Sequence, residues 1–401
     1  MNVVHGPVPD NGGIIAPASG RRIRVLHVYR TYLPDSWGGI EQAIYQLAMA
    51  TTRLGIENHI LYLSREKHFK IEQRPEGKVY RLPMDIELAS TSMSLSLLRY
   101  FSKIAARVDI INYHFPWPFA DILHLLAATG KPVILTYHSD IIRQRTLAFF
   151  YQPLMKWFLS NARAIVATSQ NYCATSPVLK RYIKKVQIIP IGLDEKCYPG
   201  VSAERVDYYR DIAGEGFFLF IGVLRYYKGL HILLDAIKGT MMRVVIVGAG
   251  PIERELKAQA RREGLTNIFF FGYLSDEDKV ALLSLCKAMV FPSHMRSEAF
   301  GVSLLEGAMF EKPLISCEIG TGSSYINIDG ITGIVVEPEN RAALRDAMLL
   351  VLDRPEECIR MGKNARARFN QLFTADIMAA RYAQLYAGML ESFRTGIREN
   401  R

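Results

Sequence analysis

The chain has 401 residues, which is too long for one ordinary core and predicts two domains of comparable size. Hydrophobic residues make up 49% of it and charged residues 22%, proportions that exclude a mostly disordered, collagen-like or coiled-coil chain. Lysine and arginine (49) exceed aspartate and glutamate (39), giving a net charge of +10. This excess favours an anionic partner, which could be a nucleoside diphosphate, a lipid phosphate, a membrane surface or a nucleic acid.

The five cysteines form no Cys-x-x-Cys pair, which argues against a disulfide framework and a finger-type zinc site and favours reduced thiols in the cytosol. No run of about 18 apolar residues is present, so no membrane-spanning helix is expected. Residues 1–20 contain only a short apolar stretch, too short for a signal peptide, and we interpret them as a disordered tail.

The first domain is expected over residues 21–198. A β-branched apolar run at 23–28 predicts a strand, a Pro- and Gly-rich loop follows at 31–39, and helical spacing predicts a helix over 40–54. Further strands are predicted at 58–63, 110–113, 133–137 and 164–168, with helical patterns between several of them. Apolar strands that alternate with helices predict a parallel sheet covered on both faces.

The same pattern begins again after a Gly- and Pro-containing linker region at 194–216. Strands are predicted at 217–221, 243–247, 268–271, 289–291 and 314–316, and helices at 230–237, 252–263, 276–286 and 302–310. The fold class is therefore α/β, with two doubly wound Rossmann-like domains, the second over residues 199–373. Ligands of such sheets bind beyond the carboxyl ends of the strands, so a cleft between the two domains is expected.

The segment from Glu298 to Glu306 is the most informative motif. It follows a predicted strand, and Gly301 is expected to open a helix whose first amides, near Val302 and Ser303, could bind a phosphate. Glu306 lies in an otherwise apolar helix and needs a hydrogen-bonding partner, for which a ribose diol is suitable. A salt bridge to a core arginine, or plain solvation, is the alternative.

Two further turns follow predicted strands in the second domain. Arg225 and Lys228 are suited to a diphosphate, although a solvated basic turn is the alternative. Gly248 and Gly250 form a glycine-rich turn, but Glu253 occupies the third glycine position of a dinucleotide fingerprint. This mismatch argues against a dinucleotide oxidoreductase and favours a tight turn near a nucleotide.

In the first domain, Gly38 and Gly39 allow the backbone to approach a ligand closely, and His138 and Asp140 end a strand. The alternative for the two glycines is that they form only a flexible connection, and the alternative for His138 is a structural role. Asp276 and Asp278 could hold a metal, but Ser275 fits a helix N-cap and acids suit a first helical turn, so no metal site is expected.

Two segments, 96–108 and 143–163, mix Lys and Arg with Leu and aromatic residues. They would suit an interfacial helix on an anionic membrane, and the alternative is that their rings fill the core of the first domain. No nucleic-acid recognition motif is visible, so nucleic acid is not expected as a partner.

Taken in order, these motifs resemble the retaining, nucleotide-sugar-dependent glycosyltransferases of the GT-B group, family 4 or group 1. The series comprises Gly38-Gly39-Ile40-Glu41, His138, Pro190-Ile191-Gly192-Leu193-Asp194, Lys228-Gly229, Gly248-Ala249-Gly250-Pro251, Phe271-Gly272, and Glu298 with Glu306. The branch with many mannosyltransferases of lipopolysaccharide and capsule assembly is the most similar.

The resemblance implies roles for individual residues. Glu306 would hold the ribose, Glu298 would contact the donor sugar and phosphates, and Lys228 would neutralise the leaving diphosphate. His138 would contact the donor sugar and Gly39 the donor phosphate. The remaining members of the donor site would be Gly38, Gly248, Gly250, the backbone near Tyr273 and Leu274, and Phe300, Gly301 and Val302.

The chain departs from the family where Val223 occupies the position of an expected arginine. Arg225, two residues on, would point the same way along an extended segment and could replace it. The resemblance also implies that residues 374–401 form a helix that returns to the first domain.

The resemblance further implies that no metal or other cofactor is needed. The expected function is transfer of a hexose, foremost mannose from GDP-mannose, to a saccharide or polyprenyl-diphosphate-linked acceptor in cell-surface polysaccharide synthesis. The expected location is the cytoplasm or the inner face of the membrane. The alternatives are another GT-B enzyme, such as a nucleotide-sugar epimerase or hydrolase, and a non-catalytic sugar-nucleotide-binding subunit.

Overall fold

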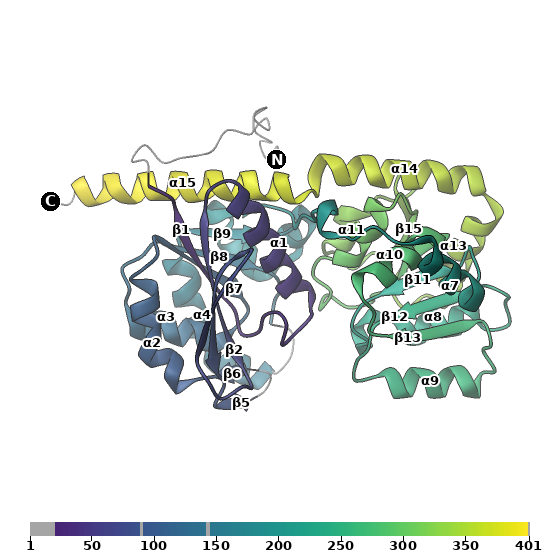
Figure 1. The fold of residues 1–401 in the computed structure, drawn as a ribbon, viewed down its shortest axis with the longest axis horizontal. Helices are drawn as coiled ribbons and strands as arrows, with labels where there is room; N and C mark the ends of the chain where they lie inside the picture. The colour runs from purple at the N-terminus through teal and green to yellow at the C-terminus, as the bar shows by residue number, and fades with distance from the viewer. Residues whose placement is uncertain (1–20, 89–90, 142–144, 400–401) are drawn as a thin grey trace.

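The computed structural model describes residues 21–88, 91–141 and 145–399. The tail predicted at 1–20 and Arg143 lie outside these ranges. Two α/β domains lie side by side, and the last helix extends from the second domain along the first (Figure 1). The prediction of two doubly wound α/β domains is confirmed.

The first domain contains an eight-stranded sheet in the order β10-β9-β8-β7-β1-β2-β4-β3, parallel except for the β3–β4 hairpin. Its strands are β1 (Arg24–Val28), β2 (Glu57–Ser64), β3 (Lys70–Arg74), β4 (Gly77–Pro83), β7 (Ile110–Phe115), β8 (Val133–Tyr137), β9 (Ala164–Ala167) and β10 (Val186–Ile188). The strands predicted at 58–63, 110–113, 133–137 and 164–168 are confirmed. A second hairpin, β5 (Ile86–Leu88) with β6 (Thr91–Met93), lies apart from this sheet. The two hairpins were not predicted, because β3 is polar and β5 and β6 are three residues long.

The helices of this domain are α1 (Gly39–Arg53), α2 (Leu95–Ala105), α3 (Pro118–Ala127), α4 (Arg145–Asn161), α5 (Gln170–Thr175) and α6 (Pro177–Arg181). Phe101 of α2 and Phe158 of α4 are fully buried in the domain core. For these two rings the core interpretation is correct and the membrane interpretation is wrong.

The second domain contains a six-stranded parallel sheet in the order β13-β12-β11-β14-β15-β16. Its strands are β11 (Phe218–Ile221), β12 (Val244–Val247), β13 (Ile268–Gly272), β14 (Ala288–Phe291), β15 (Leu314–Cys317) and β16 (Gly333–Val336). Its helices are α7 (Ala203–Ala213), α8 (Leu230–Ile237), α9 (Glu253–Arg262), α10 (Asp276–Leu285), α11 (Val302–Met309), α12 (Ser323–Ile326), α13 (Arg341–Asp353) and α14 (Pro355–Leu372). The strand order reverses between β11 and β14, which is where ligands of doubly wound sheets bind.

The chain crosses between the domains twice, and the two crossings pair with each other. Leu193 donates its backbone N–H to Phe373 and accepts a hydrogen bond from Ala375, both at 2.9 Å. Arg53, at the end of α1, forms ion pairs with Asp194 (2.6 Å) and Asp376 (2.8 Å), one on each crossing. The two connections are thus tied to each other and to the first domain.

Helix α15 (Ala375–Glu399) packs along α1 and contributes Met378, Tyr382 and Tyr386 to the first domain's core. The Tyr382 hydroxyl lies 3.0 Å from that of Thr136, and Asn112 donates to Tyr386 at 3.3 Å. The last helix is therefore part of the first domain's packing, as Figure 1 also shows.

None of the helices within the described ranges is both long and apolar enough to cross a membrane.

Candidate active site

Two segments that carry charged residues meet where the strand order of the second sheet reverses. The turn after β11 forms a short 3₁₀ helix, η3 (Tyr226–Lys228), and the loop after β14 carries Glu298. Lys228 Nζ donates to Glu298 Oε2, and the two side chains are only 11% and 10% exposed. The lysine ammonium also lies 4.6 Å from the centre of the Phe291 ring. The structure thus brings together two of the predicted site residues as a nearly buried ion pair.

Helix α11 begins directly after Gly301, which has a left-handed backbone conformation (φ 100°). A Cβ at this position would lie 3.1 Å from Leu304 and 3.4 Å from Phe291, so glycine is suited both to the backbone angle and to the space. Gly301 and Lys228 both lie against the Phe291 ring, so helix α11 begins close to the Lys228–Glu298 pair. Phe300 packs its buried ring near Phe373 in the core, so its side chain does not face the site.

Glu306 is buried one turn into α11, and its Oε1 accepts a hydrogen bond from the Tyr198 hydroxyl (2.9 Å). The same oxygen lies 3.8 Å from Lys279 Nζ. Burial lowers the pKa of Lys279, but the carboxylates of Glu306 and Asp276 outweigh this effect and raise the pKa above its ordinary value. The charge partner of Glu306 is therefore a lysine of α10 and not the core arginine considered from the sequence.

Sequence reasoning missed Tyr198 and Lys279. Tyr198 lies in the linker region, 108 positions from Glu306, and no local pattern connects the two residues. The N-cap expectation for Ser275 is confirmed: Ser275 and Asp278 form a capping box, and Asp278 also pairs with Arg205. Within the described residues, no three His, Cys, Asp or Glu side chains are grouped as metal ligands would be.

The loop of Gly38 and Gly39 approaches α11 from the first domain. A Cβ at Gly39 would lie 3.7 Å from the Val302 side chain, so the two domains meet at this position. Glu41 is buried beneath the loop, and its Oε1 accepts hydrogen bonds from Thr31 (2.8 Å) and Ser36 (2.7 Å). Glu41 therefore holds the shape of the glycine loop, a role that the sequence did not indicate.

His138 follows β8 and is 4% exposed, with its Nε2 2.9 Å from His114 Nδ1. His114 Nε2 in turn lies 3.1 Å from His27 Nδ1. Burial lowers the pKa of His27 to about 4 and that of His138 to about 3, and it lowers the pKa of His114 well below its ordinary value. All three imidazoles are therefore neutral near pH 7.

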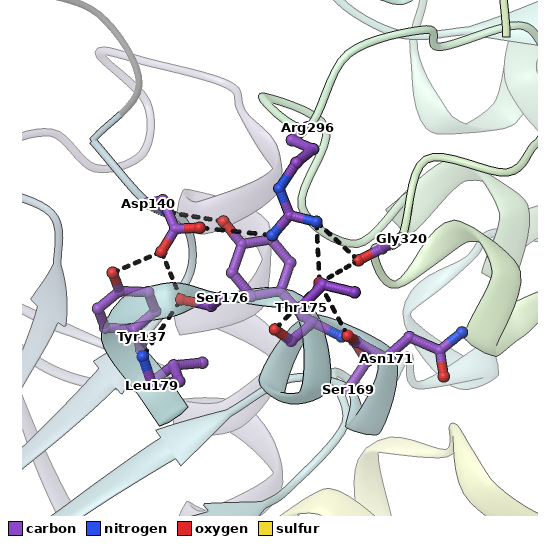
Figure 2. A network of polar contacts seen from close by, with 10 residues as sticks. Tyr137, Asp140, Ser169, Asn171, Thr175, Ser176, Leu179, Arg296 and Gly320 are labelled. Carbon is purple, nitrogen blue, oxygen red and sulfur yellow. Dashed lines mark hydrogen bonds and ion pairs between the residues drawn. The ribbon is translucent and has the colours of Figure 1, made fainter. Parts of the chain in front are cut away.

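An arginine next to Glu298 connects the two domains (Figure 2). Arg296 donates to the Thr175 hydroxyl (2.8 Å) and the Gly320 carbonyl (3.0 Å), and it lies 3.4 Å from the Asp140 carboxylate. Asp140 also accepts hydrogen bonds from Tyr137 (2.8 Å) and Ser176 (2.6 Å) in the first domain. These contacts place the Glu298 loop against the strand end that carries His138.

Three more of the predicted residues, Arg225, Tyr273 and Leu274, follow strands β11 and β13 of the second domain. Arg225 is exposed. Burial raises the pKa of Tyr29 in the first domain to about 12, and the positive charges of Arg30 and, to a smaller extent, Arg225 oppose this rise. Tyr273 is exposed opposite Trp37, with 6.1 Å between the ring centres, and is followed by the half-buried Leu274.

Gly248 and Gly250 have a packing role. A Cβ at these positions would lie 2.0 Å and 2.3 Å from the carbonyl oxygens of Gly222 and Leu224. Their small size therefore lets the turn after β12 lie directly against the turn after β11, which carries Lys228.

Comparison with known proteins identifies the family. Residues 37–196 match the family described as Glycosyltransferase Family 4, and residues 210–368 match Glycosyl transferases group 1. The chain is 55% identical over 353 residues to D-rhamnosyltransferase WbpZ of Pseudomonas aeruginosa, covering 88% of this chain and 93% of the relative. The chain belongs to the family 4, group 1 glycosyltransferases. It is a hexosyltransferase, as the resemblance predicted.

A second relative agrees with this assignment, and two solved structures share the fold. O-antigen chain mannosyltransferase C of Escherichia coli is 49% identical over 370 residues, covering 92% of this chain and 100% of the relative. The sucrose-phosphate synthase of Thermosynechococcus elongatus superposes with a TM-score of 0.77 at 20% identity, over 92% and 100% of the two chains. Anabaena Alr3699/HepE in complex with UDP and glucose superposes with a TM-score of 0.72 at 18% identity, over 91% of this chain and 99% of the other. These two structures share the fold of this glycosyltransferase.

The buried neutral histidines predict how the stability of the enzyme depends on pH. Below about pH 6.5 the unfolded chain binds protons at these residues while the folded chain does not, so the free energy of unfolding should fall. A histidine that is protonated in the unfolded chain and neutral in the folded chain changes the free energy of unfolding by about 1.4 kcal/mol per pH unit. Urea unfolding followed by circular dichroism between about pH 7.5 and pH 5, above the range of most carboxylates, measures this slope.

Replacing one buried histidine, as in His138→Gln, should reduce this slope by the contribution of one histidine, about 1.4 kcal/mol per pH unit. His68→Gln, at an exposed position, is the matched control and should leave the slope unchanged. Equal slopes for His138→Gln and the wild-type enzyme would contradict the neutral, buried state of His138.

Proposed function

We propose that this glycosyltransferase moves a mannose-type hexose from its GDP-linked donor to a polyprenyl-diphosphate-linked saccharide in O-antigen synthesis, with retention of anomeric configuration. The observation that carries the proposal is the pair of relatives that cover about nine-tenths of this chain and are named for mannosyl and D-rhamnosyl transfer, the first explicitly in the O-antigen chain. D-rhamnose is 6-deoxymannose, so the two sugars differ at one hydroxyl. GDP-mannose is the first candidate donor and GDP-D-rhamnose the second.

The geometry supports a donor that lies across the edge where the domains meet. Tyr198 and Lys279 both contact Oε1 of Glu306, which leaves Oε2 for a ribose hydroxyl. The diphosphate would lie between Lys228 and the first amides of α11, with Arg225 nearby. The sugar would then face Glu298 and, from the first domain, His138.

Charge development explains the catalytic role of Lys228. When the bond between C1 and the phosphate oxygen breaks, its electron pair leaves with the diphosphate, and C1 acquires oxocarbenium character. Lys228 and the α11 amides are fixed positive groups directed at this new charge. The acceptor hydroxyl bonds to C1 on the same face, and its proton passes to the departing phosphate oxygen. Glu298, freed from Lys228 by the diphosphate, would accept a hydrogen bond from the sugar.

The experiment that tests this function combines binding with turnover. A thermal-shift panel of GDP, UDP and ADP and their sugars should show the largest rise in Tm with GDP-mannose or GDP-D-rhamnose, because ligands that bind the folded state stabilise it. The same donor should then give a glycosylated lipid-linked acceptor. Glu306→Ala should reduce the nucleotide-dependent shift.

Three other outcomes would contradict the proposal. A preference for UDP-sugars would overturn the assignment of the base. Free sugar or an epimer without transfer would favour a hydrolase or an epimerase. Donor binding without any turnover would favour a sugar-nucleotide-binding subunit.

Removal of the Lys228 charge should lower kcat about 100-fold, as the loss of a preorganised donor does in other enzymes. Lys228→Gln is preferred to Lys228→Ala because glutamine still donates a hydrogen bond to the nearly buried Glu298. Lys257→Gln, which breaks a half-exposed pair with Glu253 on α9, is the matched control. Turnover of Lys228→Gln within twofold of that of the control would exclude the proposed role.

A lipid-linked acceptor requires access to a membrane surface, and the first domain offers one candidate. The hairpin–helix surface comprises the exposed Ile86, Leu88 and Leu95 (60%, 64% and 76% exposed) with Arg99 and Lys103 of α2. Leu95, Arg99 and Lys103 are spaced four residues apart and so lie on one side of α2. Apolar side chains bordered by cations suit an anionic membrane.

The full chain should therefore sediment with vesicles containing phosphatidylglycerol and less with phosphatidylcholine alone, and added salt should weaken the binding. Joint Leu88→Ser and Leu95→Ser substitution should reduce binding several-fold, because buried apolar area is lost. Met241→Ser, at a 92% exposed site of the second domain, is the control. Equal binding of the double variant and the control would exclude this surface.

A further inference from the structure

A row of buried polar side chains crosses the first sheet and ends at His138. We call His27, His114 and His138 the histidine row; it begins at Asn58, and its members come from the neighbouring strands β2, β1 and β7 and from the end of β8. The successive distances are 3.2 Å from Asn58 Oδ1 to His27 Nε2, 3.1 Å from His27 Nδ1 to His114 Nε2, and 2.9 Å from His114 Nδ1 to His138 Nε2.

Asn58 fixes the direction of the first hydrogen bond. Its amide nitrogen donates to the Ala48 carbonyl at 3.0 Å, and the hydroxyls of Thr51 and Thr52, also at 3.0 Å, share its second proton. A carbonyl can only accept a hydrogen bond, so the side-chain nitrogen of Asn58 faces α1 and its oxygen faces His27. The oxygen must therefore accept from His27, whose Nε2 carries the proton.

The direction then passes along the row. A neutral His27 that is protonated on Nε2 has an unprotonated Nδ1, which accepts from His114 Nε2. His114 Nδ1 is in turn unprotonated and accepts from His138 Nε2. The low pKa values of the three residues support the neutral form at every step.

We propose that Asn58, His27 and His114 are positioning residues that hold His138 in the Nε2–H tautomer, so that His138 meets the donor with an unprotonated Nδ1. The inference rests on the proposed function, in which His138 contacts the donor sugar. An unrestrained imidazole can present either a donor or an acceptor at Nδ1, whereas the row leaves only an acceptor. A sugar hydroxyl can donate to that nitrogen, and a charged imidazolium beside the cation that forms at C1 is avoided.

The tautomer can be read without any donor. In protein labelled with ¹⁵N-histidine, long-range proton–nitrogen correlation spectra should show His138 with a protonated Nε2 and an unprotonated Nδ1, unchanged between about pH 5.5 and pH 8. A protonated Nδ1, or titration of His138 within this range, would overturn the proposal.

The functional consequence is tested at His114, which receives the hydrogen bond of His138. His114→Leu removes this acceptor, and donor affinity should weaken roughly fivefold, the effect of one lost neutral hydrogen bond. His114→Gln supplies both an acceptor and a donor and should restore affinity and the Nε2–H signature. Tyr382→Phe is the matched control: it removes a buried hydroxyl beside the same 10 Å³ cavity that His114 and His138 line, and should leave both readouts unchanged.

The outcomes distinguish this inference from the proposed function. If the tautomer is as stated but His114→Leu binds donor like the Tyr382→Phe control, the positioning role is wrong and the transfer reaction stands. If the wild-type enzyme transfers no sugar, the proposed function is wrong, and the functional part of this inference is overturned with it.

Discussion

The ion pair of Lys228 and Glu298 is the interaction on which the rest of the site depends. Two nearly buried charges are costly to remove from water, and each is held in place because the other compensates it. The pair lies at the point where the strand order reverses, beside the start of α11. In the proposed reaction, the Lys228 cation is thereby fixed before the donor arrives, and little reorganisation would be needed when charge develops on the diphosphate.

The first domain contacts the chain on both sides of Glu298. Arg296, two residues from Glu298, binds Thr175 and Asp140 of the first domain. On the opposite flank, Gly39 lies against Val302 at the start of α11. The Glu298 loop and helix α11 thus meet the first domain directly, so the relative position of the domains sets the geometry of the candidate site. The paired crossings at Leu193 and Phe373 support this arrangement, since both connections are tied to α1 through Arg53.

The first domain carries an unusual amount of polar chemistry inside its sheet. The histidine row and Asn58 lie among strands whose other residues are largely apolar, and burying polar groups is tolerated only when they are hydrogen-bonded. Here each imidazole is hydrogen-bonded to the next, and helix α1 supplies the acceptors for the amide nitrogen of Asn58. A network whose members are hydrogen-bonded to one another specifies one arrangement of its rings, which suits the role proposed for His138 at its end.

The sequence by itself determined the two sheets, because β-branched runs such as 133–137 and 164–168 are buried on both faces and are therefore largely apolar. It also determined the Glu298–Glu306 element, the opening of α11 at Gly301 and the N-cap at Ser275, since each depends on neighbours within one turn or loop. Only the tertiary structure decided that Tyr198 and Lys279 hold Glu306, that Arg296 connects the domains, and that His27 and His114 stand behind His138. These partners are separated along the chain by up to 156 positions, as between Asp140 and Arg296. Hydrophobic periodicity records which face of an element is buried, but it carries no information about which distant side chain meets that face, and that depends on how the sheets and crossings pack together.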